Sequence, residues 1–292
     1  MSFGICCHTY SNPDIAETIN LEYIEEIRDA GAKWIRHNLF WNLIESTENR
    51  CDYRKHDQVV QAIQDAELKH LANLYCGNNY VFGTADDKYI QLDSAGLAKL
   101  GEFVKTTLGR YAGKIQALQI HNEPNGASFW KPTPSASEYF TLVEFLSPLI
   151  REIDPDITIV SAGLSNITGT QNTDTKFLQA LLRLGLLDLL DVVALHPYIQ
   201  SAATGRTPDL ATAAAMIRDH RGSQSIWATE WGYNSTWSGY STSSARQTAI
   251  SGMLSLCQSL GILPFIFSWT GTDAEPGFAI NSLWSGVVIP PV

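Results

Sequence analysis

The sequence has few cysteines, and they show no pattern of pairing. Its 292 residues include five cysteines, at positions 6, 7, 51, 76 and 257, and no CxxC occurs. An odd number without such a pair argues against a structural zinc site and against a disulfide framework. We therefore expect the cysteines to be buried free thiols.

Positive charge and long apolar runs are also scarce. There are 20 Lys and Arg against 30 Asp and Glu, a net charge of −10. Such a protein repels phosphate, so we expect neither nucleic acid nor an anionic membrane as a partner. No apolar run reaches the roughly 18 residues of a membrane span.

The first residues, MSFGICCHTY, lack the basic and apolar regions of a secretory leader. This fits a cytosolic protein, a phage or virion protein, or a chain whose leader was removed. An extracellular action on a polymer also remains open, and the sequence leaves the compartment and the oligomeric state unknown.

Short β-rich runs recur along the chain, with their starts roughly 30–45 residues apart, as strand–helix units require. There are eight of them: SFGICC (2–7), KWIRHNLF (33–40), HLANLY (70–75), IQALQI (115–120), ITIVSA (157–162), DVVAL (191–195), SIWAT (225–229) and PFIFSW (264–269). They are apolar throughout rather than alternating, which is typical of parallel strands buried on both faces.

Helical patterns separate these runs, for example Tyr139, Leu142, Val143, Leu146 and Ile150 at helix spacing. Eight strands and seven such patterns predict an α/β fold, a single (β/α)₈ barrel domain over residues 1–292. A final helix is either missing or short, and if present it would lie within 278–285. The alternative, an open doubly wound sheet that binds a nucleotide, is disfavoured because no GxGxxG follows the first strand.

Two glutamates stand at the carboxyl ends of predicted strands, where barrels of this kind carry their chemistry. Glu123 follows the fourth strand in QIHNEPNG, and Glu230 ends the seventh in TEWG. Two carboxylates across a cleft, one protonated and one ionised, are the equipment of glycoside hydrolysis. Arg36, on the second strand, would keep one of them ionised.

Tryptophans accompany these strand ends, among them Trp231 and Trp269, and their flat faces suit sugar rings. Trp130 and Trp237 are better explained as packing within loops. Taken alone, either glutamate could be a solvated loop residue, and His196 could be a satisfied core histidine.

The motifs HNEPN, HPY (196–198) and TEWG, in this order, resemble the retaining (β/α)₈ glycosidases of the clan that holds families 5 and 39. The resemblance implies Glu123 as general acid/base and Glu230 as nucleophile. It implies that Asn122 binds the sugar 2-hydroxyl and that Arg36 and Tyr198 hold Glu230. His196 and Trp269 would line the same subsite.

One departure favours family 39 or a neighbour. Family 5 usually places a histidine at the end of the third strand, where this chain has Tyr75-Cys76-Gly77. The prediction is a retaining glycosidase without a metal or organic cofactor, endo-acting on a β-linked polysaccharide. An exo-acting, β-xylosidase-like enzyme and a catalytically silent carbohydrate-binding barrel are the alternatives.

Overall fold

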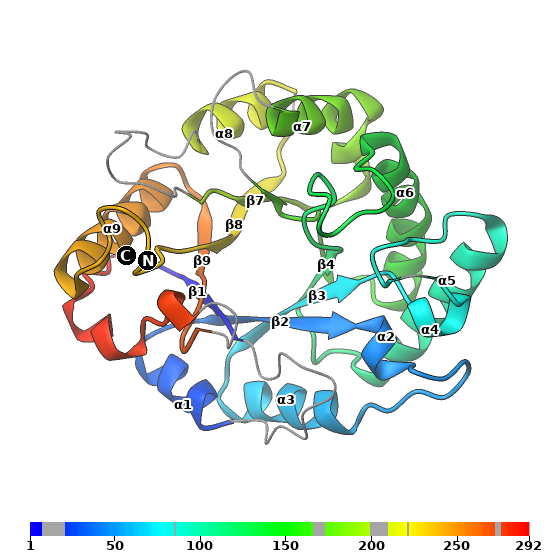
Figure 1. Ribbon diagram of the computed structural model, residues 1–292, viewed down its shortest axis with the longest axis horizontal. Helices are drawn as coiled ribbons and strands as arrows, with labels where there is room; N and C mark the ends of the chain where they lie inside the picture. The colour runs from blue at the N-terminus through cyan, green and yellow to red at the C-terminus, as the bar shows by residue number, and fades with distance from the viewer. Residues whose placement is uncertain are drawn as a thin grey trace.

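The apolar segments of the sequence form one parallel sheet that closes on itself (Figure 1). In the computed structural model, β1 pairs with both β2 and β9, and β5 pairs with β7. The strands of the barrel are β1 (Gly4–Cys6), β2 (Trp34–Phe40), β3 (Lys69–Tyr75), β4 (Ala117–Ile120), β5 (Thr158–Val160), β7 (Val192–His196), β8 (Ser225–Trp231) and β9 (Leu263–Ile266). A two-residue strand, β6 (Leu164–Ser165), pairs with β7. The structure describes residues 1–7, 21–84, 86–165, 173–198, 210–220, 222–271 and 276–291.

Helices lie around the barrel between successive strands (Figure 1). They are α1 (Glu22–Asp29), α3 (Arg54–Asp65), α5 (Ser94–Arg110), α6 (Ala136–Ile153), α7 (Thr173–Leu184), α8 (Leu210–Asp219) and α9 (Ser243–Ser259), with single turns α2 (Trp41–Ile44), α4 (Asn79–Phe82) and η1 (Leu186–Leu189). All eight predicted strands and the helices between them are present in the described residues. The predicted (β/α)₈ fold is therefore confirmed.

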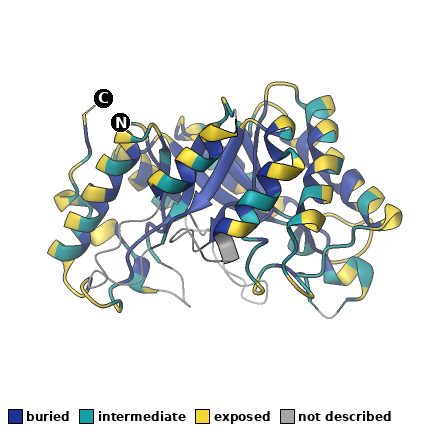
Figure 2. Ribbon diagram, turned by 90° about the horizontal axis from the view of Figure 1, so that it is seen from above, coloured by how far each residue is buried: buried dark blue, intermediate teal, exposed yellow. Residues whose placement is uncertain are grey.

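The apolar side chains form two separate layers, one inside the barrel and one between barrel and helices. Figure 2 shows the buried strands at the centre and the exposed faces of the helices outside. Inside the barrel, Trp34, Trp227 and Phe265 pack together, with 5.1 Å between the two indole centroids and 5.7 Å from Trp227 to Phe265. These three rings fill the amino-terminal half of the barrel, as expected for a packed core rather than a pore.

In the region where a final helix would be short or missing, the chain forms two short 3₁₀ helices, η3 (Pro276–Phe278) and η4 (Asn281–Gly286). Leu283 is buried, and Trp284 packs against Phe3 with 5.4 Å between ring centroids. This segment therefore covers the barrel beside Phe3, next to the start of β1.

Four of the five free cysteines are buried, as expected, but Cys51 is exposed. In the described residues, no helix combines the length and the apolar character that crossing a membrane would require.

Candidate active site

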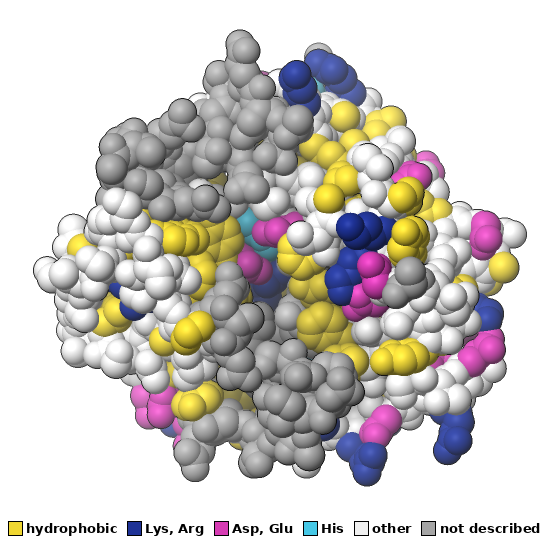
Figure 3. Space-filling view, viewed as in Figure 1, with side chains coloured by type: hydrophobic (Ala, Val, Ile, Leu, Met, Phe, Trp, Pro, Cys, Tyr) yellow, Lys and Arg dark blue, Asp and Glu magenta, His cyan; other side chains and the backbone are white. Residues whose placement is uncertain are grey.

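Glu123 and Glu230 meet at the carboxyl-terminal mouth of the barrel. Glu230 lies in β8, and Glu123 follows three residues after β4. One oxygen of each carboxylate lies within 4.8 Å of the other and of a His196 ring nitrogen. The two side chains are 14% and 16% exposed, enough for a ligand to reach. Figure 3 looks into this mouth, where acidic and histidine atoms are visible in the central recess. The structure thus brings the predicted pair together.

A tight turn after β4 presents Glu123. His121 and Glu123 both have positive φ, 70° and 42°. Such conformations cost a non-glycine residue on the order of 1–3 kcal/mol and persist where the surroundings enforce them, often at functional sites. β4 ends at Ile120, so this turn lies beyond the strand and carries Glu123 to the rim of the barrel.

The buried ring of His121 fixes this turn. Its Nδ1 accepts from the backbone N–H of Cys76 at 3.4 Å, and its Nε2 bonds the carbonyl of Phe129 at 3.0 Å. Burial lowers its pKa to about 4, so the ring is neutral near pH 7. His121 therefore serves the backbone rather than the reacting groups.

Arg36 joins three side chains at the base of the mouth. Its guanidinium donates to Oε2 of Glu230, Oε1 of Gln119 and Oδ1 of Asn122, each at 2.8 Å. Burial opposes its charge, but the neighbouring Glu230 carboxylate helps to raise the pKa of Arg36 above its ordinary value. The predicted partnership of Arg36 with one glutamate is present, and the glutamate is Glu230.

Tyr198 donates its hydroxyl to Oε1 of Glu230 at 2.8 Å. Burial and the adjacent Glu230 carboxylate raise the pKa of Tyr198 well above its ordinary value, so the hydroxyl remains a donor. Each oxygen of Glu230 therefore accepts from at least one donor, as suits a carboxylate anion.

His196 lies behind Glu123 and is fully buried. Its Nδ1 is 2.7 Å from Oε1 of Glu123, its Nε2 is 3.2 Å from Oγ1 of Thr229, and Oε2 of Glu230 is 4.0 Å from Nδ1. A Cβ at Gly163 would come within 2.0 Å of Nε2, so a glycine there makes room for the ring. His196 is thus a partner of the site, and not a core histidine remote from it.

Glu123, His196 and Glu230 are also spaced as ligands of one metal ion would be. Both oxygens of Glu230, however, already accept from Arg36 and Tyr198. A cation at this point would lie close to the guanidinium, which repels it. The donor set fits acid–base and nucleophilic chemistry better than metal binding.

Trp231 does not line the mouth, contrary to the sequence prediction. It is 1% exposed and belongs to the layer between barrel and helices. The pairing of β8 with β9 shifts register between Ala228 and Trp231. Such a bulge interrupts the alternation of side chains along the strand, so Glu230 faces the mouth while Trp231 faces outward.

Trp269 is also placed away from the two glutamates. Its indole N–H donates to Oε2 of Glu26 on α1 at 2.7 Å, and its ring packs on Trp284. Phe267 belongs instead to the apolar layer inside the barrel, 6.5 Å from Tyr198 between ring centroids. The strand ends at Ile266, so the alternation that would turn Trp269 inward does not extend to it.

The family of the protein follows from its sequence as a whole. Residues 2–273 match the model of the family described as cellulase, glycosyl hydrolase family 5. The chain belongs to glycosyl hydrolase family 5. It is a glycosidase, and family 5 is a retaining family. The resemblance to the clan of families 5 and 39 is confirmed, and within that clan the matching family is 5, although the strand-three departure favours family 39.

Solved structures share the fold of this family 5 chain. A family 39 glycoside hydrolase from the gut symbiont Bacteroides cellulosilyticus WH2 has a TM-score of 0.72 at 19% identity, over 95% of this chain and 59% of that one. The endoglucanase Cel5A from Thermotoga maritima has a TM-score of 0.70 at 16% identity, over 98% and 97%. An endo-β-1,4-mannanase from Thermotoga petrophila has a TM-score of 0.64 at 12% identity, over 97% and 75%.

These identities establish a likeness of fold. No curated protein sequence matches the chain.

Three polar residues inside the barrel of this family 5 protein were not predicted from its sequence. Gln119 and Thr229 are fully buried and contact Arg36 and His196 respectively. The amide of Asn73, on β3, lies beside Asn122 and fits best with its oxygen toward Nη2 of Arg36, 2.9 Å away. The sequence signal that could have identified these residues is a polar side chain within an otherwise apolar strand.

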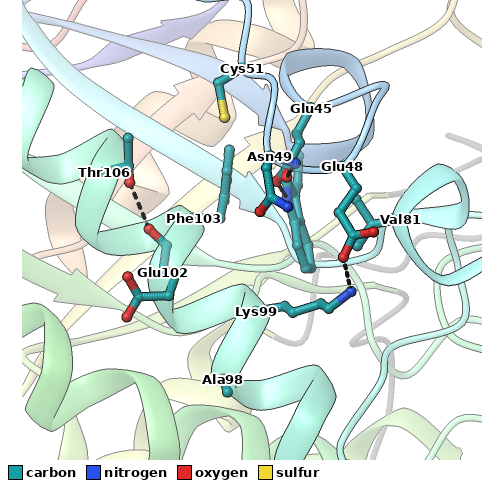
Figure 4. A pocket seen from close by; sticks show the side chains of 11 residues that line it. Glu45, Glu48, Asn49, Cys51, Val81, Ala98, Lys99, Glu102, Phe103 and Thr106 are labelled. Atoms are coloured by element: carbon teal, nitrogen blue, oxygen red, sulfur yellow. Dashed lines mark hydrogen bonds and ion pairs between the residues drawn. The ribbon is translucent and has the colours of Figure 1, made fainter.

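A second cavity lies outside the barrel, between α2, α4 and α5 (Figure 4). It has a volume of about 540 Å³, and its walls include Trp41, Phe103 and the buried carboxylate of Glu45. Glu45 already accepts from the indole of Trp41 at 2.7 Å, and Glu48 pairs with Lys99 at its rim. None of its lining residues belongs to the site around Glu123 and Glu230.

Proposed function

We propose that this glycosidase is a retaining, endo-acting enzyme for a β-linked polysaccharide, with Glu230 as nucleophile and Glu123 as general acid/base. The observation that carries the proposal is the approach of the two carboxylates to within 4.8 Å. Retaining glycosidases hold the pair about 5–5.5 Å apart, whereas inverting enzymes need about 6.5–9.5 Å to admit a water.

The different partners of the two glutamates support this assignment of roles. Glu230 accepts from a guanidinium and a phenol, which stabilise it as an anion ready to attack. Glu123 has His196 as its partner and no guanidinium in contact among the described residues. It is therefore the better candidate to carry a proton.

The reaction would proceed in two displacements. An oxygen of Glu230 attacks the anomeric carbon as the glycosidic C–O bond breaks, and Glu123 gives its proton to the leaving oxygen. Glu123, now a carboxylate, takes a proton from water, whose oxygen displaces Glu230 from the sugar. Asn122 accepts from Arg36 through Oδ1, which leaves its amide nitrogen to donate to the sugar 2-hydroxyl.

The extent of the loops supports a polymeric substrate. Long segments follow β3 (76–93) and β4 (124–134), and they meet where the backbone N–H of Lys131 donates to the carbonyl of Lys88 at 2.9 Å. Structures of proteins with the same fold have been solved in complex with cellopentaose and with mannotriose. A β-linked glucan or mannan is therefore the first substrate to test.

A panel of β-linked polysaccharides, assayed with the wild type and with Glu123→Gln, tests the proposal. We expect soluble oligosaccharides from the wild type, and a loss of roughly 10²–10⁴-fold in the variant. Monosaccharide as the first product would favour the exo-acting alternative. Retention on polysaccharide without any product, and without labelling by a fluoroglycoside, would favour the silent barrel.

A further inference from the structure

A chain of buried polar side chains runs behind the two carboxylates and links Arg36 to His196. Gln119 of β4 and Thr229 of β8 form its middle, and both are fully buried. Gln119 contacts Arg36 at 2.8 Å and Thr229 at 3.0 Å, and Thr229 contacts His196 at 3.2 Å. Because these groups are buried, each of their polar hydrogens needs an acceptor among the surrounding protein atoms.

The orientation of Gln119 follows from its neighbours. A guanidinium can only donate, so the oxygen of Gln119 faces Nε of Arg36. Its nitrogen then donates to the carbonyl of Ser161 and to Oγ1 of Thr229, each at 3.0 Å. The hydroxyl of Thr229 therefore accepts from Gln119.

The hydroxyl hydrogen of Thr229 must bond elsewhere. In the described part of the chain, the acceptor within reach is Nε2 of His196. A buried hydroxyl without an acceptor is destabilising, because no hydrogen bond replaces the one it made to water. Nε2 is thus the bare nitrogen of the imidazole, and the ring proton lies on Nδ1, facing Oε1 of Glu123 at 2.7 Å.

We propose that Thr229, oriented by Gln119, is a positioning residue that fixes His196 as the Nδ1–H tautomer. His196 then donates to Oε1 of Glu123, so the acidic proton of Glu123 resides on Oε2 and is available to the leaving oxygen. In the opposite tautomer, Nδ1 would accept that proton and turn it away from the sugar. This inference rests on the proposed role of Glu123 as the acid.

The test is ¹⁵N NMR of the histidine rings, which reports which nitrogen of His196 carries hydrogen. The His196→Gln variant assigns the signals. We expect Nδ1–H in the wild type and in Thr229→Ser, which keeps the hydroxyl. In Thr229→Val, which has the same shape without it, we expect the Nε2–H form to appear. Nε2–H in the wild type, or an unchanged tautomer in Thr229→Val, would overturn the inference.

The Gln119→Glu variant should reverse the direction of the hydrogen bonds between residue 119, Thr229 and His196, without altering the histidine or the threonine. An ionised Gln119→Glu side chain cannot donate, so the hydroxyl of Thr229 would turn toward it and Nε2 of His196 would become the donor. We expect the Nε2–H tautomer in this variant. An Nδ1–H tautomer in folded Gln119→Glu protein would contradict the proposed relay.

Kinetics provide a readout that a merely structural role would not produce. On a polysaccharide, Thr229→Val should lose roughly 10²-fold in kcat with little change in KM, the lower end of a positioned acid's contribution. On an aryl glycoside whose leaving group needs no proton, the loss should be small, and Thr229→Ser should behave like the wild type. Equal losses on both substrates would contradict the inference. A wild type without activity would refute the proposed function but leave the NMR test intact.

Discussion

Glu230 has a hydrogen-bond donor on each of its oxygens, and this arrangement sets the first prediction. Replacing it by Gln removes the negative charge and the nucleophile while keeping the size of the side chain. We expect kcat to fall by about 10⁴-fold or more, as when other catalytic nucleophiles are removed. Hydrolysis of an activated aryl glycoside measures this loss, because the departure of its leaving group needs no proton from Glu123. Rates within tenfold of the wild type would refute the assignment.

Tyr198 donates to the same carboxylate, at 2.8 Å. Its replacement by Phe removes only the hydroxyl, and a hydrogen bond to a charged group contributes about 1.5–3 kcal/mol. Because this bond stabilises the attacking carboxylate, we expect kcat/KM to fall by about 10- to 100-fold. Tyr240→Phe, at a buried tyrosine that packs on Tyr233, is the matched control and should change little. Equal rates in both variants would contradict the prediction.

At the scale of single residues, the sequence is a better guide to the side chains at the mouth of the barrel than to the buried polar side chains behind them. Arg36, Asn122 and Tyr198 all reach the predicted site. Asn122 and Tyr198 follow the ends of β4 and β7, whereas Arg36 reaches Glu230 from within β2. Gln119 and Thr229 were missed because a polar residue within an apolar strand does not reveal its partner. That partner comes from another strand, 83 positions away for Gln119 and Arg36.

At the scale of elements, the strands are predictable and their irregularities are not. Each apolar run of the sequence forms a strand near its predicted position. The bulge in β8 is different, because the register shift between Ala228 and Trp231 arises from pairing with β9. The residues TEWG contain no pattern that would predict this bulge. The outward turn of Trp231 therefore required the structure.

The helices should tolerate changes that the strand ends do not. Asp93 caps α5, accepting from the N–H of Gly96 at 2.7 Å. Asp93→Ala should lower the free energy of unfolding by about 1 kcal/mol, the usual cost of losing such a cap. Asp93→Asn, which keeps an acceptor, is the control. Urea denaturation measures the difference, and activity should be retained in both variants. Equal stability of the two would contradict the role of the cap.

At the scale of the whole molecule, buried histidines make the fold sensitive to acid. Burial lowers the pKa of His56 and His121 to about 4 and that of His70 to about 3. Below the ordinary value near 6.5, the unfolded chain binds protons that the folded chain does not. Their contribution to stability is therefore complete above pH 6.5 and is lost as the pH falls toward 4. The loss is up to about 1.4 kcal/mol per pH unit for each histidine.

His70 offers the clearest test of this effect, because neither of its ring nitrogens has a hydrogen-bond partner in the described residues. Urea midpoints of the wild type should fall between pH 6 and pH 5, where most ordinary carboxylates remain ionised. The His70→Leu variant should show a shallower fall over the same range. Identical slopes for the two proteins would exclude His70 as a source of acid sensitivity.

The packed rings of Trp34, Trp227 and Phe265 close the amino-terminal half of the barrel. The site around Glu123 and Glu230 is therefore reached from the carboxyl-terminal mouth. Incoming water must use the same passage as the departing half of the substrate, and it must wait until that half has gone. A second sugar arriving first would capture the glycosyl group in place of water. At high substrate concentration we therefore expect products longer than the substrate supplied, because the glycosyl group is transferred to a second sugar instead of to water.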